Sequence, residues 1–196
     1  MSMKVLMVID AQNDFITGAL GNKECEAAVP KIVEMINSKK YDEIILTMDS
    51  HDENYMETKE GKNLPVPHCI VPTGVWAPTD GWMIHPDVYA AIKRNYDSDK
   101  IEVFKKPTFG AISIIPKYQK LWEAYGPNLE IDFVGFCTGI CVLSNVTIAK
   151  ASIPEAEICV IEDACACVTP ETHKKAIEAM KLIQVKMLKA TDVMEA

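Results

Sequence analysis

The sequence has no excess of positive charge, no long apolar run and no regular cysteine framework. Its formal net charge is −8, so we expect no nucleic-acid partner and no anionic membrane partner. No stretch of the sequence reaches the roughly 18 apolar residues that a membrane helix needs. The apolar stretch Val5–Ile9 is too short for a secretory signal, and no basic region precedes it. These features predict a cytoplasmic protein.

The seven cysteines are an odd number and lie in apolar contexts without regular spacing. This pattern is typical of free thiols in a reducing compartment. Of the 196 residues, 48% are hydrophobic and 24% are charged, which is ordinary for a globular protein. The length fits one domain with a substantial core, and no internal repeat or low-complexity tract divides it. We therefore predict a single domain over residues 1–196.

Apolar runs of strand length alternate along the chain with amphipathic segments of helix length. The runs are rich in Val and Ile and apolar on both faces, which favours a parallel sheet covered by helices. Strands are expected at Lys4–Asp10, Glu43–Met48, Ile101–Phe104, Ile131–Phe136, Ile158–Glu162 and Gln184–Leu188. Helices are expected at Glu24–Asn37, Pro86–Asn95, Ser113–Tyr125, Gly139–Ala151 and Pro170–Lys181. The alternation predicts a doubly wound, Rossmann-like α/β domain with a mostly parallel sheet of about six strands and helices on both faces.

Reactive or charged side chains follow four of the expected strands. Asp10 ends the first strand, and Asp49 ends the second with His51 shortly after it. Lys105 and Lys106 end the third strand, and the stretch GFCTGICV ends the fourth. Ligands of doubly wound sheets bind at the carboxyl ends of the strands. We therefore expect these side chains to meet in one catalytic site.

The stretch GFCTGICV, residues 135–142, holds Cys137 and Cys141 four positions apart. This spacing differs from the CxxC of zinc ribbons and thioredoxin-like sites, and two inert packed thiols are an alternative. Gly139 permits a sharp turn from strand to helix, which places Cys141 in the first helical turn. Free backbone N–H groups and the helix dipole lower a thiol's pKa there and could also hold an oxyanion. Cys141 is therefore the better candidate nucleophile.

A cysteine nucleophile usually works with a base and a cation. Two of the four histidines, His85 and His173, precede or open expected helices and are interpreted as solvated. The other two, His51 and His68, belong to the possible metal site described below. Asp10 is then the candidate base and Lys106 its charge partner. An acid at a strand end is also often a helix cap or a salt-bridge residue, and this alternative stays open for Asp10.

Residues 49–86 form a long polar segment that carries five of the eleven prolines. A loop of this length in a compact domain is usually functional. Asp49 and His51 are alternate residues of an extended segment and can face one site, and His68 follows further along the loop. Two histidines with carboxylates suit zinc, iron(II) or manganese(II). The alternative is a solvated loop whose histidines cap local turns.

Three stretches in order resemble the isochorismatase-like cysteine hydrolases, nicotinamidases among them. They are VIDAQNDF at 8–15, KPTFGAI at 106–112 and GFCTGICV. The family shows V-D-x-Q-N-D-F, K-x-x-[FY]-[SG]-A and G-x-x-T-x-x-C-V, and the match runs over about residues 4–175. Each motif alone is weak, whereas the three in order are highly specific.

The resemblance implies a catalytic triad of Asp10, Lys106 and Cys141. Asp10 would take the thiol proton, and Lys106 would stay cationic and favour the thiolate. The motif spacing to Phe109 selects Lys106, so that Lys105 faces the other side of the strand.

The resemblance also implies an oxyanion hole made by the backbone N–H groups of Cys137 and Cys141. A non-proline cis peptide is implied at the same turn, between Phe136 and Cys137. The thiol of Cys137 would then be incidental to the reaction.

Nicotinamidases carry D-x-H, then a histidine or glutamate ligand, then a final histidine close to a proline. The ligands implied here are Asp49, His51, Glu60 and His68, with Glu57 as the competitor of Glu60. The cofactor implied is a divalent metal ion, with zinc as the first expectation and iron or manganese as alternatives. The segment 49–86 would be a metal-binding insertion.

The reaction implied is hydrolysis of a small amide through a thioester, first of all nicotinamide to nicotinate and ammonia in NAD salvage. Phe15, Trp76 and Phe109 are candidate aromatic walls for a flat ring, and core packing is the alternative for each. Two departures from the family pattern leave the substrate open. The first motif is followed by ITGALGN, and Leu64 stands where a Trp is usual.

Three other functions compete with this hypothesis. One is hydrolysis of another small amide or ureido compound, one is isochorismatase activity, and one is a non-catalytic scaffold role. The family often forms dimers or tetramers, so a homo-oligomer is also expected.

Overall fold

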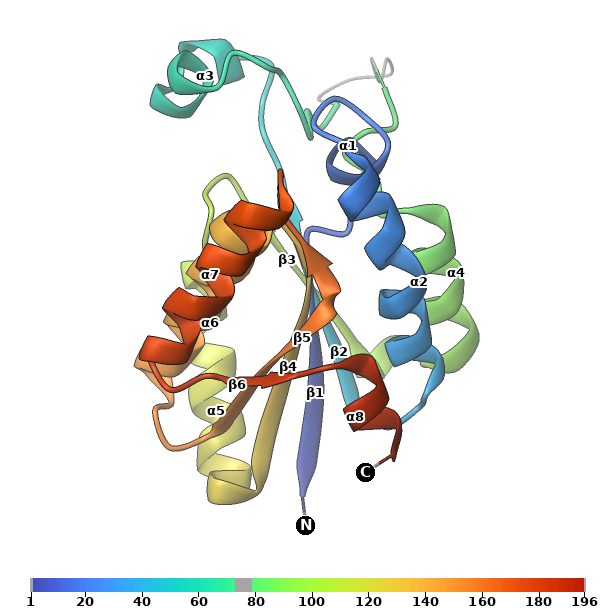
Figure 1. The fold of residues 1–196 in the computed structure, drawn as a ribbon, viewed down its shortest axis with the longest axis vertical. Coiled ribbons are helices and arrows are strands. Elements are labelled where there is room, and N and C mark those ends of the chain that lie inside the picture. Colours follow the sequence, from blue (N-terminus) through green and yellow to red (C-terminus); the bar gives the residue numbers. More distant parts are fainter. Residues whose placement is uncertain (1, 73–78, 196) are drawn as a thin grey trace.

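Six strands form one sheet in the computed structural model, which describes residues 2–72 and 79–195 (Figure 1). Neighbouring strands are parallel and follow the order β3-β2-β1-β4-β5-β6. This is the order of a doubly wound fold, so the predicted fold class is confirmed. The strands are β1 (Met3–Ile9), β2 (Glu43–Asp49), β3 (Ile101–Lys106), β4 (Leu129–Phe136), β5 (Glu157–Ala166) and β6 (Lys186–Leu188).

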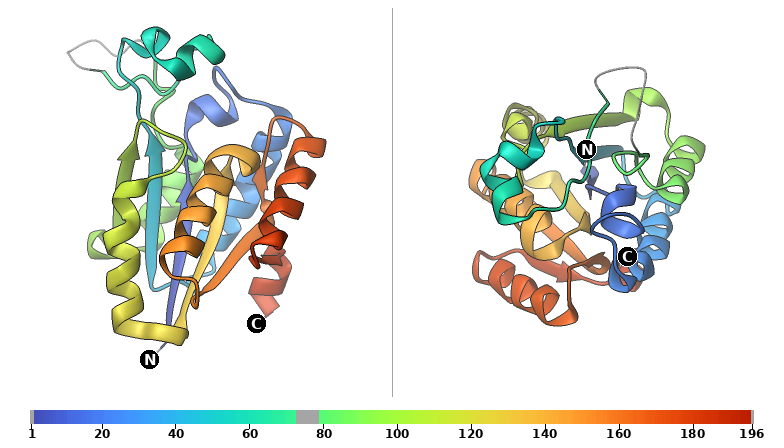
Figure 2. Two further views of the ribbon diagram at one scale, coloured as in Figure 1. Left: turned by 90° about the vertical axis from the view of Figure 1, so that its left-hand side faces the viewer. Right: turned by 90° about the horizontal axis from the view of Figure 1, so that it is seen from above.

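Helices cover both faces of the sheet (Figures 1 and 2). One face packs against α2 (Lys23–Asn37), α4 (Pro86–Asn95) and α8 (Ala190–Glu195). The opposite face packs against α5 (Ile115–Tyr125), α6 (Leu143–Ser152) and α7 (Pro170–Leu182). Among the described helices, none is both long and apolar enough to cross a membrane.

The central strand β1 shows why the strand sequences are apolar on both faces. Leu6 and Val8 point into the core beneath α2, whereas Met7 and Ile9 point into the core on the opposite side. All four side chains are fully buried. Each such side chain contributes roughly 1.5–3 kcal/mol by leaving water. The Val- and Ile-rich runs thus reflect a strand with no solvated face.

Strand β5 is longer than the expected Ile158–Glu162, because the ladder with β4 resumes after an irregularity. Phe133 pairs with Val160, but Gly135 pairs with Cys165. Polar residues in this bulged stretch interrupt the apolar pattern, so the sequence does not indicate a strand there. The extension carries β5 up to the turn that follows β4.

Three short helices and one irregular turn were not expected from the sequence. The short helices are α1 (Asn13–Ile16), α3 (Lys59–Asn63) and α8, each too short to show a clear period. The expected helix Gly139–Ala151 begins instead with a π-helical turn, Thr138–Val142, and α6 follows it.

The carboxyl ends of β1 to β5 lie at one edge of the sheet, at the top of Figure 1. The segment after β2, with α3, lies above this edge, as does α1. At the switch point of the topology, β1 and β4 are neighbours although about 120 residues separate them. A doubly wound sheet opens a crevice at this point.

Candidate active site

Asp10 follows β1 and is held firmly by the neighbouring strand β2. Its backbone adopts a positive φ of 45°, and its N–H donates to the Thr47 carbonyl at 3.2 Å. The Thr47 hydroxyl donates to Asp10 Oδ1 at 2.6 Å. Both residues are fully buried. One carboxylate oxygen is therefore occupied, and Oδ2 faces the rest of the site.

Lys106, the last residue of β3, reaches into the same buried space. Its Nζ lies 2.6 Å from Asp10 Oδ2 and 3.5 Å from Cys141 Sγ. Only 2% of the Lys106 residue is exposed, whereas Lys105 is exposed on the other side of the strand. The structure thus brings Asp10, Lys106 and Cys141 together from three strand ends.

Cys141 sits in the turn that joins β4 to α6. The Val142 N–H donates to the Cys137 carbonyl at 3.1 Å, which closes the wide turn. The peptide between Phe136 and Cys137 is cis. Gly135, with a φ of 117°, passes so close to β1 that a Cβ there would collide with the Ile9 carbonyl. The turn can approach Asp10 only because this position is glycine.

Burial decides the protonation states at this cluster. Burial raises the pKa of the Cys141 thiol well above its usual range, the Asp10 carboxylate raises it further, and the Lys106 ammonium only partly opposes them. The expected lowering of the Cys141 pKa by the helix start is therefore wrong, because desolvation of the thiolate outweighs it. Burial also raises the pKa of Asp10, against the opposing effect of Lys106.

Lys106 behaves in the opposite way. Burial alone would lower its pKa, but the Asp10 carboxylate, then Cys141 and Asp49, raise it above the usual value. Lys106 is thus cationic at neutral pH. The resting cluster therefore holds a protonated thiol, the carboxyl group of Asp10 in contact with it, and a permanent positive charge on Lys106.

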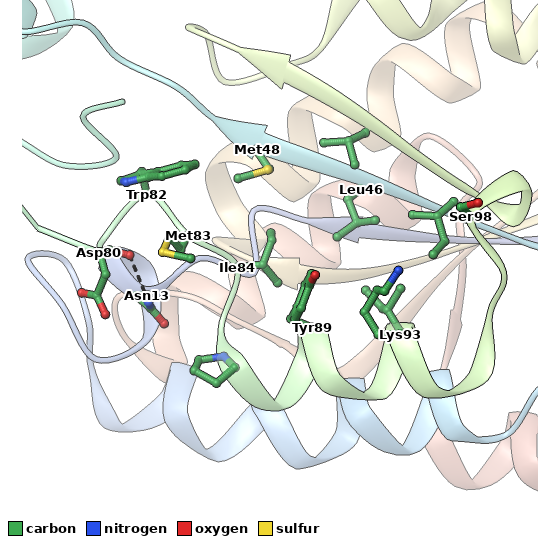
Figure 3. Close-up of a pocket in the computed structure, with 14 residues that line it drawn as sticks. Asn13, Leu46, Met48, Asp80, Trp82, Met83, Ile84, Tyr89, Lys93 and Ser98 are labelled. Atoms are coloured by element: carbon green, nitrogen blue, oxygen red, sulfur yellow. Dashed lines mark hydrogen bonds between the residues drawn. The ribbon is translucent and has the colours of Figure 1, made fainter. Parts of the chain in front are cut away.

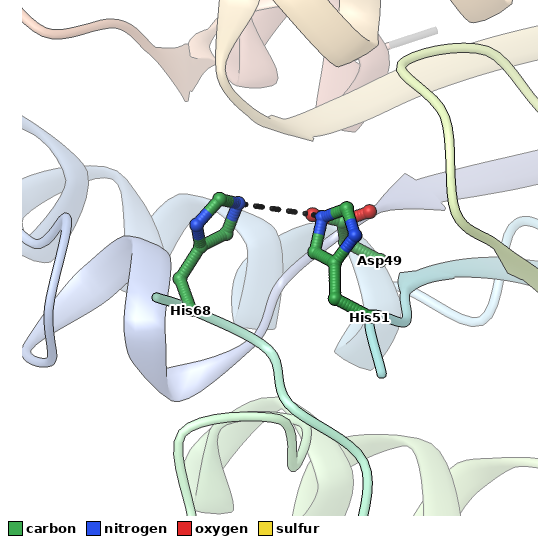
Figure 4. A group of neighbouring side chains, drawn as sticks. All are labelled: Asp49, His51 and His68. Carbon is green, nitrogen blue, oxygen red and sulfur yellow. Dashed lines mark hydrogen bonds and ion pairs between the residues drawn. The ribbon is translucent and has the colours of Figure 1, made fainter. Parts of the chain in front are cut away.

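A second cluster lies next to the first, where β2 ends. Asp49, His51 and His68 are buried, and their ligand atoms lie within 4.8 Å of one another (Figure 4). The Nε2 atoms of His51 and His68 lie 3.0 Å and 3.3 Å from Asp49 Oδ2. Asp49 Oδ1 lies 3.6 Å from Lys106 Nζ, so the two clusters share an edge.

Glu60 adds a second carboxylate to this cluster. Its Oε1 lies 3.8 Å from His51 Nε2 and 3.9 Å from His68 Nε2. Its competitor Glu57 is exposed on the short turn before α3. The geometry therefore favours Glu60 over Glu57 as a member of the set.

The donor set fits a divalent metal ion. His68 Nδ1 lies 2.8 Å from the Val66 carbonyl, which can only accept, so Nδ1 carries the proton. In a neutral His68 the lone pair of Nε2 then faces the carboxylate of Asp49. Such a contact needs a second proton on His68 or a cation between the two groups. Two imidazoles and two carboxylates are typical ligands of zinc and of manganese(II) or iron(II).

The three predicted aromatic walls lie in different places. Phe15 is buried, and its ring meets the His68 ring edge-on at 5.5 Å between centroids. Phe109 is 49% exposed, so its side chain is not a buried wall of the cluster. Trp76 lies outside the described residues. Tyr55, which the sequence did not single out, packs at 4.7 Å from the His51 ring.

Three buried polar residues support the site, and none was singled out from the sequence. Gln12 accepts from the Asp49 N–H at 2.7 Å and donates to the Asp49 carbonyl at 2.9 Å, which fixes the end of β2. Asn145 donates to the Cys141 carbonyl at 2.8 Å and accepts from the Ala111 N–H at 3.0 Å. Thr47 holds Asp10, as described above. For two of them the sequence held a signal of proximity to the site: Gln12 lies in the first motif, and Asn145 lies one helical turn after Cys141.

His173 also differs from its interpretation as a solvated residue. It is half-buried on α7, and its Nδ1 lies 2.8 Å from the hydroxyl of Thr138. Thr138 begins the turn Thr138–Val142, which carries Cys141 and is called the catalytic turn below. His85 caps the start of α4 by accepting from the Asp87 N–H at 3.3 Å.

A large cavity lies elsewhere, between α4 and the strands β2 and β3 (Figure 3). It measures about 630 Å³, and most of its lining side chains are apolar, among them Leu46, Met48, Trp82 and Tyr89. A smaller cavity of about 260 Å³ borders His51, Tyr55 and Glu60. Of these two cavities, the smaller one borders the candidate metal ligands.

A thiol, a carboxylate and an ammonium gathered at the carboxyl edge of a parallel sheet are the arrangement of an α/β hydrolytic enzyme. The chain belongs to the isochorismatase-like hydrolase family, because the model of the isochorismatase domain matches residues 4–192. No curated protein sequence matches the chain.

Several solved structures share this fold. The nicotinamidase/pyrazinamidase of Bacillus subtilis is 24% identical, with a TM-score of 0.79 over 95% of this chain and 100% of that one. The pyrazinamidase/nicotinamidase of Streptococcus mutans is 23% identical, with a TM-score of 0.77 over 94% and 99% of the two chains. The pyrazinamidase of Pyrococcus horikoshii, solved in complex with zinc, is 23% identical, with a TM-score of 0.71 over 95% and 98%.

Proposed function

We propose that the chain is a cysteine-dependent amidohydrolase, with nicotinamide as its first candidate substrate. One observation carries the proposal: Lys106 Nζ lies 2.6 Å from Asp10 Oδ2 and 3.5 Å from Cys141 Sγ in a buried site. A thiol held beside a carboxylate and a fixed cation has the parts needed for covalent catalysis.

In the first half of the proposed reaction, Asp10 takes the proton of Cys141 as the sulfur attacks the amide carbon. The carbonyl oxygen becomes an oxyanion, which the backbone N–H groups of Cys137 and Cys141 would hold. The tetrahedral intermediate then collapses, and ammonia leaves with the proton from Asp10. The product of this half is a thioester on Cys141.

In the second half, Asp10 takes a proton from water, which attacks the thioester. The Cys141 sulfur leaves and regains its proton, and the acid is released. Lys106 stays cationic in both halves. Its charge stabilises the thiolate that develops during attack and departure, which the raised resting pKa of Cys141 makes necessary.

Asp49, His51, Glu60 and His68 would hold a divalent ion, with zinc first and iron or manganese as alternatives. When bound, such an ion supplies a Lewis-acidic position that can orient a ring nitrogen. The zinc complex of the Pyrococcus horikoshii pyrazinamidase supports this assignment. Residues 49–86 would then be the metal-binding insertion of a single domain.

The choice of nicotinamide rests on the nicotinamidases among the similar structures and on Phe15 beside the histidines. This substrate would place the enzyme in cytoplasmic NAD salvage. The family resemblance also supports a homo-oligomer, a dimer or a tetramer, which light scattering would measure. Another small amide or ureido compound is the second candidate, because Leu64 replaces the usual Trp near the last ligand.

The test is an ammonia-release assay on metal-loaded protein with nicotinamide, pyrazinamide and simple aliphatic amides. We expect turnover of nicotinamide by the native protein and none by the Cys141→Ala variant. Cleavage of another amide but not of nicotinamide would retain the mechanism and overturn the substrate. Activity of the Cys141→Ala variant equal to that of the native protein would overturn the mechanism.

A further inference from the structure

Three cysteines lie close together behind the catalytic turn. Cys25 lies on α2, Cys137 follows β4, and Cys167 follows β5. All three are buried in the core between the sheet and α2, whereas Cys141 belongs to the core on the opposite face. The thiol of Cys137 therefore does not face the reacting sulfur, although its backbone belongs to the same turn.

The neighbouring strands β4 and β5 carry Cys137 and Cys167 to the same end of the sheet. Gly135 pairs with Cys165 and Phe136 pairs with Ala166, and Cys137 and Cys167 are the residues that follow this last pair. Cys137 has extended backbone angles, with φ −85° and ψ 146°. The Cys167 sulfur lies against the turn itself, 3.5 Å from the position that a Cβ would take on Gly139. The thiol of Cys137 also contacts the thiols of Cys25 and Cys167.

Of these three cysteines, Cys167 lines a cavity. The cavity measures about 280 Å³ and reaches the surface between α2 and the start of α7, at the exposed residues Glu24, Thr169 and Pro170. Its lining also contains Cys165 and His173. A small polar molecule can enter such a cavity and meet Cys167 before it meets Cys137 or Cys25.

The surroundings of Cys167 favour its thiolate. Hydrogen bonds from the Cys137 thiol first, then from Thr172 and the N–H groups of Gly139 and Val168, lower the pKa of Cys167 to about 5, although burial opposes them. Other titratable groups face this region. His173 interacts with Cys167 and with Glu162. Glu24 and Asp163 line the same cavity, and Cys25 faces it from α2. A thiolate at neutral pH is the form that reacts with peroxide.

We propose that Cys167 and Cys137 are a peroxide-sensitive thiol pair whose disulfide distorts the catalytic turn. The Cys167 thiolate attacks hydrogen peroxide, so that an S–O bond forms, the O–O bond breaks and hydroxide leaves. The Cys137 sulfur then attacks the sulfenic sulfur, the S–O bond breaks, and the oxygen leaves as water with the thiol proton. Two thiol sulfurs are oxidised, and one peroxide is reduced.

The disulfide draws the two sulfurs to about 2.05 Å, which pulls Cys137 toward Cys167 at the end of β5. The N–H of Cys137 is a proposed oxyanion donor, and such a donor works only at about 2.7–3.1 Å from the oxyanion. Loss of amidase activity on oxidation therefore rests on the proposed function. Formation of the disulfide does not.

The experiment treats the metal-loaded native protein with hydrogen peroxide, blocks free thiols with an alkylating agent and maps cross-linked peptides by mass spectrometry. We expect a peptide pair joined through Cys137 and Cys167 that dithiothreitol removes. The Cys167→Ala and Cys167→Ser variants should form no such pair. The Cys165→Ala variant is the matched control from the same cavity and should form it as the native protein does.

Activity is measured in parallel on whichever amide the protein cleaves. In the native protein and in Cys165→Ala, we expect peroxide to lower the activity at least tenfold and dithiothreitol to restore it. In Cys167→Ala, we expect no loss of activity that dithiothreitol reverses. A native protein in which Cys167 stays fully alkylatable, or in which Cys25 and Cys137 form the pair, would overturn the proposal. A disulfide without any amidase activity would instead overturn the proposed function and leave the thiol pair intact.

Discussion

The ammonium of Lys106 lies 2.6 Å from Asp10 Oδ2, and both side chains are almost completely removed from water. Neither charge has solvent to replace its partner, so the two groups depend on each other energetically. Removal of one member of a buried ion pair costs about 3–5 kcal/mol, because the other charge stays behind unpaired. The pair is thus part of the proposed catalytic triad and also a constraint on folding.

The Lys106→Met variant should therefore lose stability as well as activity. We expect unfolding free energy to fall by about 3–5 kcal/mol in urea titrations, together with loss of amide hydrolysis. Lys105→Met is the matched control, because Lys105 is exposed, and it should stay within about 0.5 kcal/mol. The double variant Asp10→Asn/Lys106→Met should regain stability but not activity. Equal stability of the two single lysine variants would contradict this account.

Thr47 is expected to position Asp10 for proton transfer. The Thr47→Val variant keeps the side-chain shape but removes the hydroxyl that donates to Asp10 Oδ1 at 2.6 Å. A lost hydrogen bond to a charged group costs about 1.5–3 kcal/mol, which corresponds to a roughly 10- to 100-fold fall in kcat. KM should change little, because Thr47 lies behind Asp10. Thr147→Val, at an exposed position of α6, is the control, and the idea fails if both variants keep full kcat.

Metal content should depend on the buried histidines and on Glu60. We expect His51→Ala and His68→Ala to lose at least tenfold in zinc affinity, measured by titration of the chelator-treated protein. Glu60→Gln should weaken binding, whereas Glu57→Gln should bind as the native protein does, because Glu57 is exposed. The reverse order for the two glutamates would assign the ligand to Glu57. This measurement does not depend on enzymatic activity.

The reactivity of Cys167 should have an unusual pH dependence. Its thiolate is stabilised, with a pKa of about 5, so the reactive form persists above that pH and is lost as the pH falls through it. Alkylation by iodoacetamide should thus be nearly constant from pH 8 to pH 6 and should slow below pH 5. Cys165 lines the same cavity, but burial raises the pKa of its thiol, so it should react slowly throughout. Site-specific rates come from mass spectrometry, and a Cys167 rate that climbs steadily up to pH 8 would disprove the stabilised thiolate.

Much of the fold follows from local sequence pattern, and the strand ends identified most of the polar cluster. Side chains alternate along a strand, so Lys105 and Lys106 are expected on opposite faces of β3, and Lys106 is the buried one. The extension of β5 was not foreseeable, because its irregular pairing with β4 interrupts the apolar pattern. The protonation of Cys141 also escaped prediction. Its pKa depends on how deeply tertiary packing buries the thiol, which no local motif encodes.

The supporting residues escaped prediction for a related reason. Thr47 and Asn145 bond to groups that come from distant segments, so their partners are visible only after the sheet has formed. Glu60 and Glu57 both fit the expected spacing, and only the start of α3 at Lys59 turns Glu60 toward the histidines.

The strand order has a consequence for the assembly of the enzyme. Asp10 and Cys141 follow strands that pair directly, yet the chain between them must first complete β2 and β3. Contacts of such long sequence separation form late, because the entropy of loop closure must be overcome first. A refolding chain should therefore recover helical circular dichroism before it recovers catalysis. Activity then reports on the final docking of the two halves of the sheet, and a partly folded molecule carries a thiol without its base.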